Sequence, residues 1–168
     1  MRKLLSVADS ITVWAGRVGA VSAVAMVCVV SYGVFIRYVA HAPELWPYEM
    51  TIMLGGSVFI IGLSYAELKD AHVGVDIFTS RLSPRVVAII NVVCALLFLF
   101  PPVFFITYIS IGWAWDAWVG GERMAFTGWY PPAWPLRTMF ALGFFCLSLQ
   151  GTARFVRRLH YVVRGESI

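Results

Sequence analysis

Residues 46–76 decide the fold: they read WPYEMTIMLGGSVFIIGLSYAELKDAHVGVD, and the apolar run at 50–66 carries no charge. A helix needs about 20 largely apolar residues to cross a bilayer, and residues at its ends extend the run to that length. Trp46 and Glu49 stand at one end, and the polar cluster 67–76 follows the other. The pattern predicts a membrane-spanning helix with charged residues only at its two ends.

The composition agrees with a membrane protein. The chain has 168 residues, of which 60% are hydrophobic and 13% are charged. A soluble domain is usually about half apolar and about a quarter charged. The net charge of +4 comes from cations placed between apolar runs. Membrane topology explains these cations better than nucleic-acid binding, so no nucleic-acid partner is expected.

Three further apolar runs accompany this one. They predict an all-α integral membrane protein with one domain, residues 1–168, and four transmembrane helices. The third run is too long for a straight span, and Pro101-Pro102 within it predicts a kink. The expected spans are about 18–36, 48–68, 84–115 and 131–153.

The N-terminal segment allows two interpretations. In residues 2–17, apolar residues recur at helical spacing, which fits an amphipathic helix on the membrane surface or simply the entry to the first span. Arg2 and Lys3 resemble the start of a signal peptide. The apolar run continues to Ile36, however, so we expect an uncleaved first helix.

Charge asymmetry predicts the orientation. Four spans put both termini on one side, and that side carries ten of the lysines and arginines against three on the other. Cytoplasmic loops carry the excess of positive charge, so both termini are expected in the cytoplasm. The three cations on the opposite side are Arg37, Arg123 and Arg137.

The residues argue against several kinds of chemistry. The histidines, His41, His72 and His160, lie at helix ends or in loops, where membrane cytochromes do not hold haem. No nucleophile stands beside a base, and neither metal-ligand spacing nor a phosphate loop is present. We therefore expect no cofactor, no metal and no catalytic residue. The span centres also lack charge, which argues against a solute pathway through this chain alone.

Several residues are candidates for structural or subunit-interface roles. Glu49 is expected near one membrane surface, either paired with Arg137 or Arg37 or extending to water. His72 and Asp76 are one helical turn apart and would order a cytoplasmic turn or contact a partner. Tryptophans gather near the same surface as Glu49, as anchors in the interface or as partner contacts. The remaining candidates are Trp46, Trp129, Trp134, Gly55 and Gly56; the two glycines suggest close helix packing.

Several short motifs occur in order along the chain: Arg37-Tyr38, Trp46-Pro47-Tyr48-Glu49, Gly55-Gly56, residues 72–76 (HVGVD), 82–85 (LSPR), 128–135 (GWYPPAWP) and 149–151 (LQG). Together they resemble the small membrane subunit of tripartite ATP-independent periplasmic (TRAP) transporters. The resemblance runs from about Ser31 to Arg158. Two positions depart from the family pattern: Tyr48 replaces an acidic residue that often precedes Glu49, and Gly74 replaces a residue that is often basic.

The resemblance implies a function. A periplasmic binding protein would deliver an organic acid to a two-subunit complex in the bacterial inner membrane. The large subunit would carry substrate and sodium and move like an elevator, while the small subunit would form part of the static scaffold, with lipid filling gaps. The alternative is a free-standing four-helix membrane transporter or exporter. The substrate is not encoded in this chain.

Overall fold

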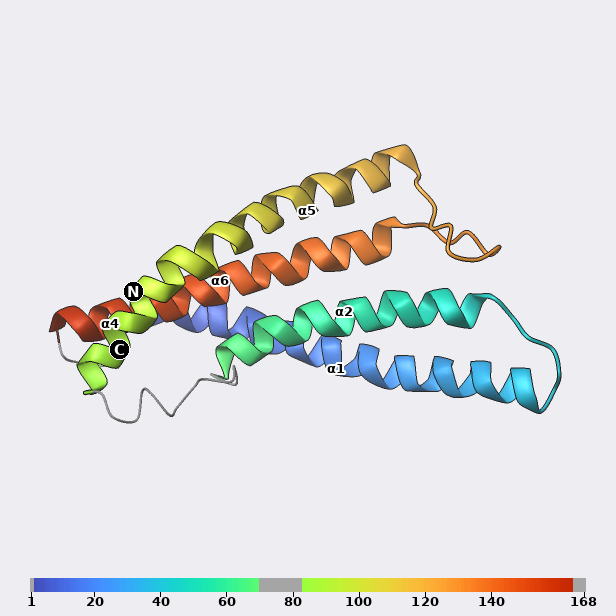
Figure 1. The fold of residues 1–168 in the computed structure, drawn as a ribbon, viewed down its shortest axis with the longest axis horizontal. Coiled ribbons are helices and arrows are strands. Elements are labelled where there is room, and N and C mark those ends of the chain that lie inside the picture. The colour runs from blue at the N-terminus through green and yellow to red at the C-terminus, as the bar shows by residue number, and fades with distance from the viewer. Residues whose placement is uncertain (1, 70–82, 165–168) are drawn as a thin grey trace.

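The computed structural model describes residues 2–69 and 83–164, and within them the chain folds into helices joined by short loops (Figure 1). Four helical stretches in this part are long and apolar enough to cross a membrane: Leu5–Tyr38, Trp46–Leu68, Val86–Gly120 and Trp134–Val163. The prediction of an all-α protein with four spans is confirmed. The elements are α1 (Arg2–Tyr38), α2 (Trp46–Leu68), α4 (Pro84–Cys94), the π-helix η1 (Ala95–Leu99), α5 (Phe100–Gly120) and α6 (Trp134–Arg164).

Helix α6 is the centre of the bundle. It contacts α1, α2, α4 and α5, while α1 packs mainly against α2 (Figure 1). The start of α1 and the end of α6 lie together at one end, which we call the terminal end. The loops at 39–45 and 121–133 lie at the opposite end, which we call the loop end.

Glycines set the distance between neighbouring helices. A Cβ added to Gly143 of α6 would lie 2.6 Å from Ile60 Cγ1 of α2, so the two backbones approach as closely as this side chain allows. Between α1 and α2, a Cβ added to Gly16 would likewise lie 2.6 Å from the Tyr65 ring. Small residues at helix contacts are typical of membrane bundles, where van der Waals packing drives association. The predicted close packing is confirmed at Gly56, where an added Cβ would lie 3.1 Å from Leu136 and Phe140 of α6, whereas Gly55 makes only an ordinary contact with Met26 of α1 at 3.4 Å.

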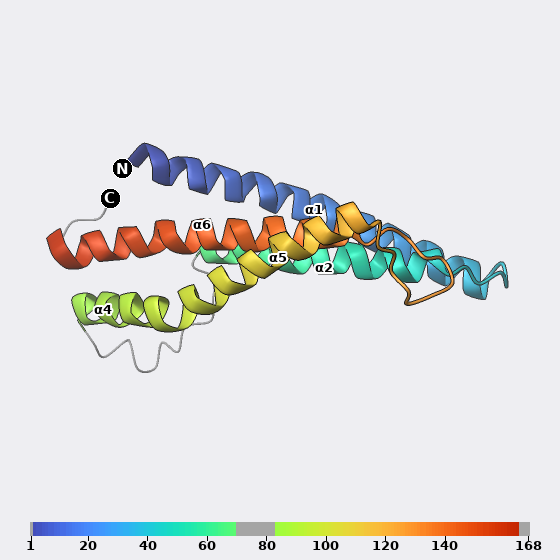
Figure 2. The same cartoon turned by 90° about the horizontal axis from the view of Figure 1, so that it is seen from above.

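The third span bends at the predicted place. Pro101 and Pro102 have no backbone N–H and cannot continue the α-helical bonding pattern. In the turn before these prolines the helix widens into the π-helix η1, where the Phe100 N–H donates to the Ala95 carbonyl. Figure 2 shows α4 and α5 meeting at an angle at this point. The long third run is therefore accommodated as a bent helix.

The N-terminal segment is part of the first helix. Because α1 is unbroken from Arg2 to Tyr38, a separate surface helix is not formed, and residues 2–17 are the entry to the span. Leu5 and Ala8 are buried against α6. Val7, Ile11 and Trp14 of the same segment are exposed.

The fourth span begins later than predicted, at Trp134 rather than at residue 131. The preceding prolines are held in a turn instead: the Met124 N–H donates to the Pro131 carbonyl at 2.8 Å, and the Ala133 N–H donates to the Glu122 carbonyl at 2.8 Å. This bridge keeps residues 131–133 extended, so the helix starts after them.

Substitution Gly143→Ala tests the close contact of α2 and α6. The added methyl group would overlap Ile60, and overpacking of this kind costs about 1–3 kcal/mol. We expect a lower midpoint of thermal unfolding in detergent for Gly143→Ala and partial recovery in the double variant with Ile60→Val. Gly62→Ala is the control, because nothing lies within 4 Å of a Cβ there. Equal midpoints for Gly143→Ala and Gly62→Ala would contradict the contact.

Candidate functional site at the two ends of the bundle

Glu49 joins the start of α2 to the loop between α5 and α6. Its side chain is fully buried, and Oε1 accepts a hydrogen bond from the Thr127 backbone N–H at 2.8 Å and another from the Thr127 hydroxyl. The same hydroxyl accepts from the Trp129 N–H at 3.3 Å. Glu49 also lies in the first turn of α2, where the partial positive charge of the helix N-terminus stabilises a carboxylate. Glu49 therefore fixes the loop that carries Trp129.

The predicted pairing of Glu49 with Arg137 or Arg37 is wrong. Arg137 forms an ion pair with Glu122, and its guanidinium lies 4.2 Å from the centre of the Trp113 ring. Arg37 is exposed near Glu44. Glu49 faces the loop instead, where backbone and hydroxyl donors take the place of a cation. Extension of Glu49 to water is wrong as well, because the side chain is buried.

The other candidate tryptophans are fixed by local contacts at the loop end. The Trp46 indole N–H donates to Glu44, and its ring lies 5.3 Å from that of Tyr32. Trp134 packs edge-on against Trp118, with 4.7 Å between ring centres. Aromatic residues thus join α1 to α2 and α5 to α6, while the expected roles as membrane anchors or partner contacts stay predictions.

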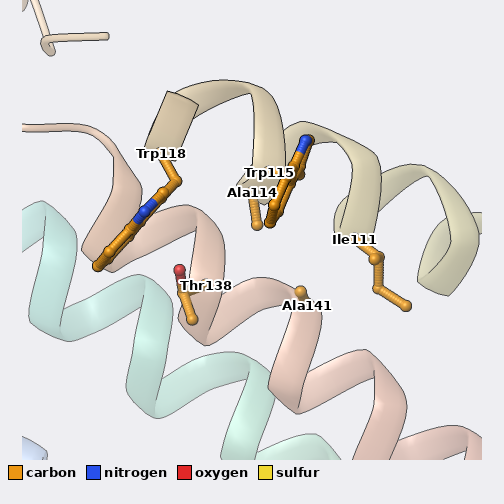
Figure 3. Close-up of a pocket in the computed structure, with 6 residues that line it drawn as sticks. All are labelled: Ile111, Ala114, Trp115, Trp118, Thr138 and Ala141. Carbon is orange, nitrogen blue, oxygen red and sulfur yellow. The ribbon is translucent and has the colours of Figure 1, made fainter. Parts of the chain in front are cut away.

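Two recesses open at the loop end. One, of about 270 Å³, lies between α5 and α6 and is apolar except for the Thr138 hydroxyl (Figure 3). A second, of about 200 Å³, lies between the end of α1 and the start of α2 and includes Arg37 and Glu44. The first is lined by Ile111, Ala114, Trp115, Trp118, Thr138 and Ala141.

Ion pairs and a side-chain amide hydrogen bond connect the helices at the terminal end. Arg157 of α6 donates to Asp9 of α1 at 2.6 Å, and the Gln150 amide donates to the other oxygen of Asp9 at 3.1 Å. Arg154 reaches Glu67 of α2 at 2.9 Å. Helix α6 is thereby tied to both α1 and α2 at the end where the chain begins.

Between the two ends, hydroxyl groups bond within the bundle. Ser57 and Ser64 donate to carbonyls of their own helix, to Met53 and Ile61, both at 2.7 Å. Thr107 of α5 lies 2.8 Å from the Ser148 hydroxyl of α6. In residues 2–69 and 83–164, no three His, Cys, Asp or Glu side chains gather as metal ligands would. The arrangement is suited to holding helices together.

The site has members that the sequence did not single out. Thr127, Glu122 and Asp9 each complete a contact with a residue at least fifteen positions away, and no local pattern marks such a partner. His72 and Asp76 lie outside the described residues, so their expected contact stays a prediction.

Substitutions at Glu49 test how the loop is held. Loss of hydrogen bonds to a charged group costs about 1.5–3 kcal/mol each, which raises the open population of the loop about tenfold or more. We expect Glu49→Ala and Thr127→Val to speed trypsin cleavage after Arg123, while Glu49→Gln keeps an accepting oxygen and cleaves more slowly than Glu49→Ala. Glu44→Ala is the control, since Glu44 bonds Trp46 and Tyr32 instead. Unchanged cleavage of Glu49→Ala would contradict this role.

The two ion pairs at the terminal end should differ in their effect on stability. Glu67 is buried, whereas the Asp9 side chain is one-third exposed. Removing one partner of a buried pair costs about 3–5 kcal/mol, against about 0.2–1 kcal/mol for an exposed pair. We therefore expect Arg154→Gln to lower the thermal midpoint more than Arg157→Gln. The reverse order would show that burial does not decide their contributions.

Comparison with known proteins assigns the chain to a family. No curated protein matches it. The family model described as tripartite ATP-independent periplasmic transporters, DctQ component, matches residues 26–160, which includes the loop end and most of α6. The match covers most of the chain and agrees with the motifs at 46–49 and 128–135. The chain therefore belongs to the DctQ family, the small membrane subunits of tripartite ATP-independent periplasmic transporters.

Proposed function

We propose that this protein is the static scaffold subunit of a TRAP transporter in the bacterial inner membrane. It would support a large elevator-type subunit that takes up an organic acid together with sodium, after a periplasmic binding protein has delivered the acid. The family assignment supports the transport complex. The scaffold role rests on one structural observation: α6 contacts all the other described spans and is bonded to α2 at the terminal end and to α5 at mid-span.

The middle of the bundle supports the same role. A transport pathway needs polar or ionisable groups near the membrane midplane or helices broken in paired positions. Here the hydroxyl groups of Ser57, Ser64, Thr107 and Ser148 bond to carbonyls or to each other, and the buried carboxylates Glu49 and Glu67 lie at opposite ends. The substrate and sodium sites are accordingly assigned to the large subunit, and we propose no catalytic role for this chain.

The excess of cations at the terminal end supports an orientation with both termini in the cytoplasm. The loop end, with Glu49, Trp129 and Trp134, would then face the periplasm. This places the exposed aromatic residues of the 121–133 loop on the side from which the binding protein arrives. The large subunit, the binding protein and membrane lipids are the partners that this arrangement implies.

Reconstitution tests the proposed function. The small subunit, the large subunit and the binding protein of the same transporter are combined in liposomes with a sodium gradient, and uptake of the binding protein's organic acid is measured. We expect uptake from the complete system and its loss when the small subunit is omitted. Uptake by the small subunit alone would favour a free-standing transporter. Undiminished uptake without the small subunit would contradict the scaffold role.

A further inference from the structure

Tyr108 of α5 differs from Ser57, Ser64, Thr107 and Ser148, whose hydroxyl groups bond within the bundle. Its side chain is 79% exposed, and its hydroxyl donates to no described residue. The preceding residue, Thr107, contacts Ser148, which lies near the middle of the charge-free stretch 138–153 of α6. Tyr108 is therefore at mid-span and points away from α6.

The depth of Tyr108 keeps its hydroxyl from water. Side chains of a helix tilt toward its N-terminus, which for α5 is away from the loop end. Asp116, the first charged residue toward the loop end, lies eight residues away, about 12 Å along the helix. A hydroxyl facing lipid tails at this depth would have no hydrogen-bond partner, and such groups are costly in hydrocarbon. The exposed Tyr108 hydroxyl would therefore be stabilised by a hydrogen-bond partner, which lipid tails lack.

The surface around Tyr108 fits a helix. One side of α5 is formed by Tyr108 and by residues spaced three or four positions apart on either side of it: Phe104, Phe105, Gly112 and Trp115. We call this side the Tyr108 face. Phe105 and Trp115 are 65% and 67% exposed, and nothing lies within 4 Å of a Cβ built on Gly112. A glycine on an exposed face lets a second backbone approach closely. The apolar recess of Figure 3 borders this face through Trp115.

The exposed face of α1 provides a contrast within the same bundle. Val21, Val24 and Val27 are each at least 60% exposed there, and this row offers neither a hydroxyl nor a glycine. Branched aliphatic side chains of this kind suit contact with lipid tails. Aromatic residues, by comparison, are enriched in the buried cores of protein interfaces.

We propose that the Tyr108 face is where a transmembrane helix of the large subunit docks. The helix would place its backbone against Gly112, accept a hydrogen bond from the Tyr108 hydroxyl with a carbonyl or hydroxyl oxygen at mid-membrane, and put an apolar side chain into the recess beside Trp115. This inference rests on the proposed function, because it takes the large subunit as the partner.

Photo-crosslinking locates the docking face directly. The photoreactive residue p-benzoylphenylalanine replaces Tyr108 in one variant and Val24 in another, each co-expressed with the large subunit and irradiated in membranes. We expect an adduct with the mass of both subunits at position 108 and none at position 24. An adduct at 24 but not at 108 would overturn the inference. So would an adduct of two copies of this chain, or labelling of lipid alone, at position 108.

Matched substitutions test the two features that carry the proposal. Gly112→Leu blocks the approach at Gly112, while Gly62→Leu makes the same change where a Cβ also meets nothing within 4 Å. We expect Gly112→Leu to reduce the co-purified large subunit about tenfold and Gly62→Leu to leave it unchanged. Tyr108→Phe removes only the hydroxyl and should reduce co-purification about threefold or more, whereas Tyr130→Phe, in the loop at 121–133, should not. Equal yields within each pair would overturn the inference.

The unmodified chain separates this inference from the proposed function. If the large subunit does not co-purify with the unmodified chain, the proposed function fails. If it co-purifies but neither Gly112→Leu nor Tyr108→Phe reduces its yield, the scaffold role stands and only the docking face is wrong.

Discussion

The structure depends on one constraint: within the hydrocarbon core, a polar group has no water to bond. The constraint explains why Ser57 and Ser64 donate to carbonyls of their own helix and why Thr107 and Ser148 face each other between α5 and α6. It also explains why the ionisable residues occur at the two ends. In such a bundle these four hydroxyl groups are already bonded, so they are not available to a solute.

The position of α6 follows from the same constraint. It is the most buried of the four candidate spans and contacts α1, α2, α4 and α5. At its terminal end, Arg154 and Arg157 form ion pairs with acidic residues of α2 and α1. At its middle, the Ser148 hydroxyl bonds to Thr107 of α5. Movement of one helix relative to α6 would break contacts at several depths together. The arrangement therefore favours a body that moves as a unit or stays still, which is what a scaffold requires.

The sequence predicted the spans well because hydropathy and charge act locally. The kink at Pro101-Pro102 was predictable for the same reason, since a proline alters bonding within its own turn. The partner of Glu49 was not predictable: Thr127 is 78 residues away, and a backbone N–H is present in every residue type except proline, so no sequence pattern marks this donor. Arg137 was assigned to the wrong acid because depth alone does not show that Glu122 lies beside it.

The two ends of the bundle are held by different chemistry, and the difference has a physical consequence. At the loop end, a fully buried carboxylate is held by a backbone N–H and a hydroxyl of one loop, so its geometry depends on the conformation of that loop. At the terminal end, Asp9 and Arg157 are partly exposed and are therefore weakened by salt. The Glu49 contact is therefore less sensitive to salt than the Asp9–Arg157 pair, but it depends on the position of residues 121–133. A protein arriving at the loop end would act on the part of the bundle where Glu49 bonds to Thr127 and so joins α2 to the α5–α6 connection.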